Sequence, residues 1–118
     1  MQFDLWSYRN DVVDAGELMN LTGYNVQATN GRIGLIDDTS DEVGMSHIVV
    51  DTGPWMVGTK VLLPAGTIVR IDHQERNVYL DRTKDEIKNA PEYDEALRKD
   101  PDYHSRLGSY YGRPGAGV

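Results

Sequence analysis

The sequence contains no cysteine. Disulfide bonds, thiolate nucleophiles and cysteine-based metal sites are therefore excluded, and cysteine usage says nothing about the redox state of the surroundings. The sequence also lacks a basic segment followed by an apolar one near its start, and it has no apolar run near the ~20 residues that cross a bilayer. We therefore expect a soluble cytoplasmic protein without direct membrane insertion.

Positive charge is scarce in this chain. Twelve Lys and Arg residues stand against nineteen Asp and Glu residues, which gives a net charge of −7 and a pI near 4.8. Phosphate backbones and anionic lipid head groups are bound mainly through Lys and Arg. We therefore expect no nucleic-acid partner.

The middle of the chain, residues 24–81, is rich in short strand-like runs separated by Gly, Pro, Asn and Asp. Asn30-Gly31 predicts a two-residue hairpin turn, and Gly34 predicts a bulge or tight bend in the following strand. The expected strands are residues 24–29, 32–37, 46–51, 60–63, 67–72 and 78–81. Strands of this length and spacing favour an all-β fold, a small closed six-stranded β barrel.

The flanking segments are more polar, and after residue 81 the pattern changes to helix. Thr83 and Glu86 have the spacing of a capping box. A second short helix is expected over residues 91–100, because Pro91 suits a first helical position and Pro101 stops the helix. We therefore divide the 118 residues into an N-terminal extension that packs on the barrel (1–20), the barrel domain (21–94), and a helix end with a flexible tail (95–118).

Four stretches of the chain resemble a known family. They are residues 31–34, residues 49–53 with Trp55, residues 58–64 and, most specifically, residues 78–93. On these stretches the chain resembles PRC-barrel proteins, both the stand-alone bacterial type and the barrel domain of the photosynthetic reaction centre H subunit. The same barrel forms a domain of a ribosome maturation factor. The resemblance implies a six-stranded barrel that serves as a docking or structural module and shares no catalytic residues.

Metal and catalytic sites find little support in the sequence. His47, His73 and His104 lack the short-range spacing of a zinc site. The acidic loop 37–42 supplies four carboxylates, enough for a weak calcium site, but it lacks the EF-hand pattern, and a solvated loop that protects a sheet edge is the preferred interpretation. Carboxylates at the ends of the expected strands belong to Asp51, Asp72 and Asp81, and no pattern groups them. We therefore expect no enzyme.

The outer surface is then the expected working part of the molecule. A barrel of six strands is narrower than the ~8 strands at which an interior begins to hold a ligand, so no cofactor is expected. Trp55, Met56 and Tyr79 are the candidate residues of an exposed apolar interface. The preferred hypothesis is a non-enzymatic protein-binding or scaffold module whose partner is another protein or a second copy. A small-molecule or metal sensor that uses the acidic loop and His47 is the alternative.

Overall fold

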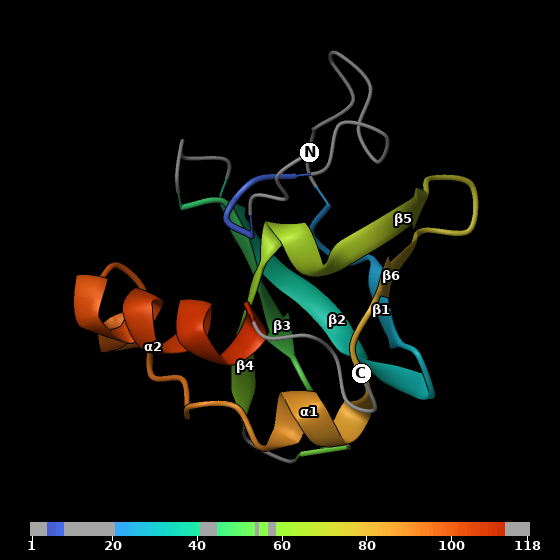
Figure 1. Cartoon of the computed structure of the whole chain (residues 1–118). Coiled ribbons are helices and arrows are strands. Elements are labelled where there is room, and N and C mark those ends of the chain that lie inside the picture. Colours follow the sequence, from blue (N-terminus) through green and yellow to red (C-terminus); the bar gives the residue numbers. More distant parts are fainter. Residues whose placement is uncertain (1–4, 9–20, 41–44, 54, 57–58, 113–118) are drawn as a thin grey trace.

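The computed structural model describes residues 5–8, 21–40, 45–53, 55–56 and 59–112. Within these ranges there are six strands: β1 (Asn25–Ala28), β2 (Gly31–Ser40), β3 (His47–Asp51), β4 (Lys60–Pro64), β5 (Ile68–Asp72) and β6 (Asn77–Leu80). They form one sheet in the order β4-β3-β2-β1-β6-β5 (Figure 1). β1 and β6 are parallel, and the other neighbouring pairs are antiparallel. The predicted β-rich, six-stranded architecture is thus confirmed as a mixed sheet.

The first hairpin shows how local sequence shapes the sheet. Ala28 pairs with Gly31, so the two turn residues are Thr29 and Asn30, one position earlier than predicted. Gly31 itself has a φ of +148°, which favours glycine. The bulge predicted at Gly34 is present, because the register shifts beside it. A Cβ on Gly34 would lie 2.0 Å from the carbonyl oxygen of Asp51, so only glycine permits this approach of β3.

The sheet is rolled but is not closed. β4 and β5 are its edge strands, yet the single 3-10 turn η1 (Ala65–Thr67) connects them directly. The chain from Pro64 to Ile68 reaches at most about 14 Å, so the two edges must come near each other at this corner. The predicted closed barrel is corrected in this respect, because the residues that would extend the pairing form η1 instead.

A hydrophobic core fills the inside of this rolled sheet. Every strand contributes buried apolar side chains, among them Val26, Ile36, Ile48, Leu63, Ile68 and Val78, each at most 2% exposed. Residues 5–8 cover one side, since Leu5, Trp6 and Tyr8 pack against the core, while the rest of the predicted N-terminal extension (1–4 and 9–20) lies outside the described ranges. The backbone of residues 5–8 is fixed there because Leu5 and Trp6 accept hydrogen bonds from Gly66 (2.7 Å) and Ser46 (3.0 Å).

The first helix, α1 (Lys84–Lys88), begins as its sequence predicts. Glu86 donates its backbone N–H to Oγ1 of Thr83 (3.1 Å), and Thr83 donates its own N–H to Oε1 of Glu86 (3.0 Å). The capping box is therefore confirmed. No helix in the described part of the chain is both long and apolar enough to span a membrane.

The second helix lies later in the chain than predicted. The expected helix over residues 91–100 is reduced to the short 3-10 turn η2 (Glu95–Leu97), and α2 (Pro101–Tyr111) follows it. Pro101 begins this helix rather than ending one, because Asp100 caps it by accepting the N–H of Asp102 (2.9 Å). The region expected to be a flexible tail thus contains an ordered helix beside β4, while residues 113–118 lie outside the described ranges (Figure 1).

Candidate functional site

Four polar side chains form a row across four neighbouring strands on the outside of the sheet. Arg70 of β5 pairs with Tyr79 of β6, Tyr79 pairs with Gln27 of β1, and Gln27 pairs with Arg32 of β2. Directly paired residues point to the same face of a sheet. At a strand spacing of about 4.8 Å, this outer row extends for about 14 Å. It brings two guanidinium groups, a phenol ring and an amide onto one surface.

Alternation along the strands places these side chains outside. The neighbours Val26, Ala28, Val78 and Leu80 point into the core and are buried. The side chains between them must then face the opposite way. Arg32 and Arg70 are exposed, and Gln27 and Tyr79 are half-buried against adjacent strands. The outward direction of Gln27 and Tyr79 is therefore a direct consequence of the same period of two that builds the core, and Arg32 and Arg70 join them through strand pairing.

Arg70 and Tyr79 form the centre of this surface. The guanidinium carbon of Arg70 lies 4.6 Å from the centroid of the Tyr79 ring, and the Arg70 side chain is 61% exposed. A planar guanidinium held over a ring leaves its second face free to stack. The pair is worth about 0.5–1 kcal/mol as an exposed cation–π contact. It forms a flat cationic platform.

A second row of paired residues lies alongside the outer row. It consists of Asp72, Asn77, Asn25 and Leu35. Asn77 donates to the Tyr79 hydroxyl (3.4 Å), and Nε of Arg32 donates to Oδ1 of Asn25 (2.9 Å). These bonds link the two rows, so the surface has fixed amide donors and acceptors next to its cationic groups.

The negative charge of Asp72 is partly satisfied within the protein. Its carboxylate accepts the backbone N–H groups of Gln74 and Glu75, each at 3.0 Å. It also pairs with Arg70 at 3.4 Å. An acidic residue at the end of β5 therefore holds the turn and orients Arg70, rather than standing as an unpaired charge on this surface.

The three residues predicted as an interface lie in two places. Tyr79 belongs to the outer row. Trp55 and Met56 follow β3, are half-buried and pack against the core. The ammonium of Lys84 lies 5.0 Å from the centroid of a Trp55 ring. A protein interface made by Trp55, Met56 and Tyr79 stays a prediction.

The acidic loop takes a different form from the one expected. Asp37 and Asp38 are residues of β2, and residues 41–44 lie outside the described ranges. Asp37 pairs with Lys60 (3.0 Å) and Asp38 with Arg98 (2.7 Å). The hydrogen bond from Arg98 lowers the pKa of Asp38, which stays ionised. These two carboxylates hold cationic side chains of the same chain.

The histidines are likewise engaged. His47 is buried, with Nδ1 2.7 Å from the carbonyl oxygen of Met45 and Nε2 3.1 Å from Nε of Arg98. Since Arg98 can only donate, Nε2 accepts and Nδ1 carries the proton. Burial lowers the pKa of His47, so the ring is neutral. His73 contacts the Tyr24 hydroxyl at 2.9 Å, and His104 lies on α2.

The strand-end carboxylates are held separately. Asp51 accepts the N–H of Gly53 (2.9 Å), Asp81 pairs with Arg82 (2.9 Å), and Asp72 holds its turn as described above. Among the residues that the structure places, no three His, Asp or Glu side chains are grouped so as to hold a metal ion.

The chain is similar in structure to proteins of known structure. No family model matches the chain, and no curated protein matches it. A crystal structure of a putative 16S ribosomal RNA processing protein, RimM, from Pseudomonas aeruginosa is similar over 55% of this chain, with 25% identity and a TM-score of 0.46. The chain spans 42% of the length of that protein.

This finding corrects two expectations from the sequence. A generic protein-binding or scaffold module, with a metal or small-molecule sensor as the alternative, does not agree with a neighbour named for ribosomal RNA processing. The expected absence of a nucleic-acid partner does not agree with it either. The net charge is also a weak guide to local binding, because it averages over the whole surface, whereas Arg32 and Arg70 share one row.

Part of the outer row could be predicted from the sequence. Alternation in residues 24–29 and 67–72 places Gln27 and Arg70 on the polar side of their strands. The pairing of β1 with β6 was not predictable in the same way, because about 50 residues separate the two strands in the chain. The row exists only once these strands lie side by side.

Proposed function

We propose that this chain is a non-catalytic protein that acts on ribosomal RNA and binds a single-stranded segment of it on the outer row. The observation that carries the proposal is Arg70 stacked on Tyr79 at 4.6 Å, with Gln27 and Arg32 continuing the row. Unpaired RNA bases stack on aromatic rings and on guanidinium planes, and they hydrogen-bond through their edges. The outer row supplies both kinds of contact.

Each residue has a distinct task in this proposal. A base stacks on the open face of the Arg70 guanidinium. The Gln27 amide, with Asn25 and Asn77 beside it, bonds to base edges, because an amide offers both a donor and an acceptor. The guanidinium of Arg32 pairs with a phosphate. A row of about 14 Å is long enough for about two or three bases, the number that the four-stranded sheet of RNA-recognition domains stacks.

The acidic balance of the chain limits how RNA is held. A net charge of −7 opposes binding along a long phosphate backbone. Recognition then depends more on stacking and on base edges than on phosphate contacts. We therefore expect a preference for short unpaired segments over duplex RNA. The proposed role on ribosomal RNA also implies a location in the cytoplasm.

We also infer that the rolled sheet is a PRC-type barrel. The resemblance of residues 31–34, 49–53, 58–64 and 78–93 to that family supports the assignment, as does the six-stranded sheet whose edges are joined by η1. The assignment gives the outer row a rigid base, because the core side chains of every strand lie directly beneath it.

Binding of short single-stranded RNA, followed by fluorescence anisotropy, tests the proposed function. Oligonucleotides that tile 16S ribosomal RNA are the probes, and a duplex of the same sequence is the comparison. Arg70→Gln should weaken binding about tenfold, since one base stack is worth about 1–3 kcal/mol. Lys88→Gln, an exposed change of equal charge on α1, should leave binding unchanged. Equal loss in both variants, or no binding by the parent protein, would overturn the proposal.

A further inference from the structure

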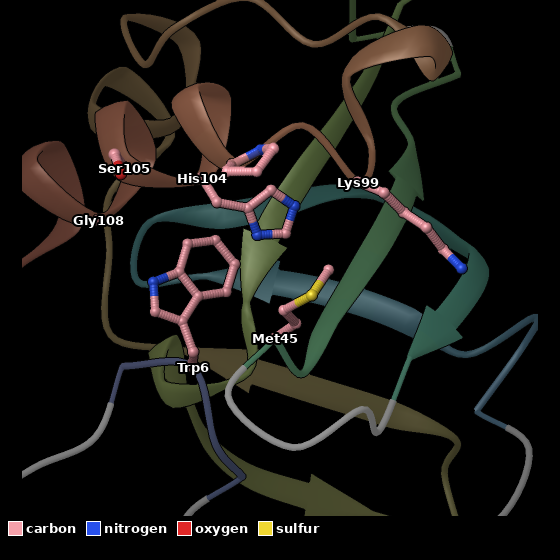
Figure 2. A pocket seen from close by; sticks show the side chains of 7 residues that line it. Trp6, Met45, Lys99, His104, Ser105 and Gly108 are labelled. Carbon is pink, nitrogen blue, oxygen red and sulfur yellow. The ribbon is translucent and has the colours of Figure 1, made fainter.

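A pocket lies at the start of α2, and none of its lining residues belongs to the four strands of the outer row (Figure 2). Its volume is about 300 Å³. The lining residues come from three separate segments and are Trp6, Met45, Lys99, Pro101, His104, Ser105 and Gly108. This volume is at the lower end of small-molecule sites, which suits one ring system with a short substituent.

The aromatic wall of the pocket is held in place before any ligand arrives. The rings of Trp6 and His104 stack with centroids 4.7 Å apart and an angle of 23° between their planes. Gly108 permits this position, because a Cβ there would lie 3.3 Å from Nε1 of Trp6. The hydrogen bond from Ser46 to the Trp6 carbonyl anchors the backbone. A planar ligand therefore meets a rigid wall.

His104 presents a hydrogen-bond acceptor to the pocket. The side chain is 9% exposed, and its Nε2 bonds to the carbonyl oxygen of Arg98. A carbonyl can only accept, so Nε2 donates its proton to it, and Nδ1 is the ring nitrogen left to accept a hydrogen bond. Among the described residues Nδ1 makes no hydrogen bond, and it is accessible from the pocket, since no buried side-chain nitrogen or oxygen there lacks a partner. Figure 2 shows it on the side of the ring toward Trp6 and Met45.

A cationic group completes the pocket. Lys99 lies at its rim and is exposed, and Ser105 is also part of the lining. The pocket thus combines an aromatic wall, one accessible hydrogen-bond acceptor and a cation at its rim. A ligand that satisfies all of these has a flat ring, an N–H donor on that ring and an anionic group a short distance away.

We propose that this pocket binds one nucleotide whose base carries an exocyclic amino group, either as a free nucleoside monophosphate or as an unpaired nucleotide of RNA. The base lies against Trp6, and its amino group donates to Nδ1 of His104. The phosphate pairs with the ammonium of Lys99 at the rim. The site is separate from the outer row, so it is occupied whether or not that row binds RNA.

Tryptophan fluorescence tests this site directly. The chain has two tryptophans, so Trp55→Phe leaves Trp6 as the sole reporter. AMP should quench Trp6 saturably with a Kd below about 1 mM, an affinity suited to one base and one phosphate. IMP, which has a carbonyl in place of the amino group, should bind at least about fivefold more weakly. Equal binding of AMP and IMP, or no saturation with AMP, CMP and GMP, would overturn the proposal.

Variants at exposed positions keep the test independent of folding. Lys99→Gln should weaken AMP several-fold but leave adenosine unchanged, because only AMP has a phosphate, and Lys88→Gln should change neither. An identical AMP response in Lys99→Gln and the parent protein would contradict the assignment. An adenine-containing single-stranded RNA, titrated into the Arg70→Gln variant, separates the two sources of ligand. Quenching of Trp6 by both ligands assigns the site to any exposed nucleotide, whereas quenching by AMP alone assigns it to free nucleotides.

Discussion

Nε of Arg98 donates a hydrogen bond of 3.1 Å to Nε2 of His47, although 51 residues separate the two in the chain. The same guanidinium pairs with Asp38 at 2.7 Å. His104 packs edge-on to His47, with ring centroids 5.8 Å apart. One arginine therefore fastens the C-terminal segment to β2 and β3, and this contact depends on an uncharged His47.

This contact predicts a stability that falls as the solution becomes acidic. Burial lowers the pKa of His47 below its ordinary value of 6.5, so the unfolded chain binds a proton more readily than the folded one. The contribution is complete above pH 6.5 and is lost as the pH falls toward the lower pKa of the folded state. Asp38 adds a similar loss only below its ordinary value of 3.8. Thermal unfolding at pH values on either side of 6.5 measures the effect.

A histidine variant serves as the matched control. His47→Gln should flatten the dependence of the melting temperature on pH in this range, because Gln does not titrate. His73→Gln, at an exposed turn, should retain the slope of the parent protein. A slope that survives in His47→Gln would show that other groups cause it.

Gly34→Ala should be among the most damaging single substitutions in the sheet. The added methyl group would lie 2.0 Å from the backbone oxygen of Asp51, and backbone cannot move aside as a side chain can. We expect a loss of about 3 kcal/mol or more in the free energy of unfolding, or no folded protein. Gly23→Ala meets nothing within 4 Å but has a φ of +89°, so it should cost only about 1–2 kcal/mol. Urea unfolding of the two variants and of the parent protein measures these changes in the free energy of unfolding.

Leu107→Ala tests whether α2 belongs to the same folding unit as the sheet. Leu107 is 1% exposed and part of the common core, so its removal should cost about 2–5 kcal/mol. Arg106→Ala changes the exposed neighbour and should cost less than about 0.5 kcal/mol. When denaturation is followed with one probe in the sheet and another in α2, both probes should report the same single transition. A silent Leu107→Ala would indicate that α2 is only loosely attached.

Salt dependence distinguishes arginine contacts on the outer row from diffuse attraction. The single phosphate contact proposed for Arg32 predicts a slope of about −0.7 for the logarithm of the binding constant to single-stranded RNA against the logarithm of salt concentration. Arg32→Gln should bring this slope close to zero. Lys88→Gln should leave it at the parent value. A much steeper slope in the parent protein would point to backbone binding over a larger surface.

The sequence alone predicted several features of local structure. The alternation in residues 24–29, the capping box of Thr83 and Glu86, and the bend at Gly34 each depend on neighbours in the chain, and each is present. The prediction failed where one residue has two local interpretations. Pro101 suits both the end of one helix and the start of the next, and the structure uses it as the start, with Asp100 as the cap.

The partners of Arg98 show the same limit. Its position four residues after Asp94 predicts an ion pair along a helix, but that helix does not form, and the guanidinium meets Asp38 and His47 of the sheet instead. Contacts between distant segments carry no local signature, because they depend on how the whole core packs.

The sequence by itself therefore determined a cysteine-free, acidic, β-rich chain with six strands and a capped short helix, since these follow from composition and short-range periodicity. Only the tertiary structure decided that the sheet rolls without closing, that α2 completes the core, and that Arg32, Gln27, Tyr79 and Arg70 share one row. Strand order and register place these side chains together, and both are set by burial of the core on the opposite face of the same strands.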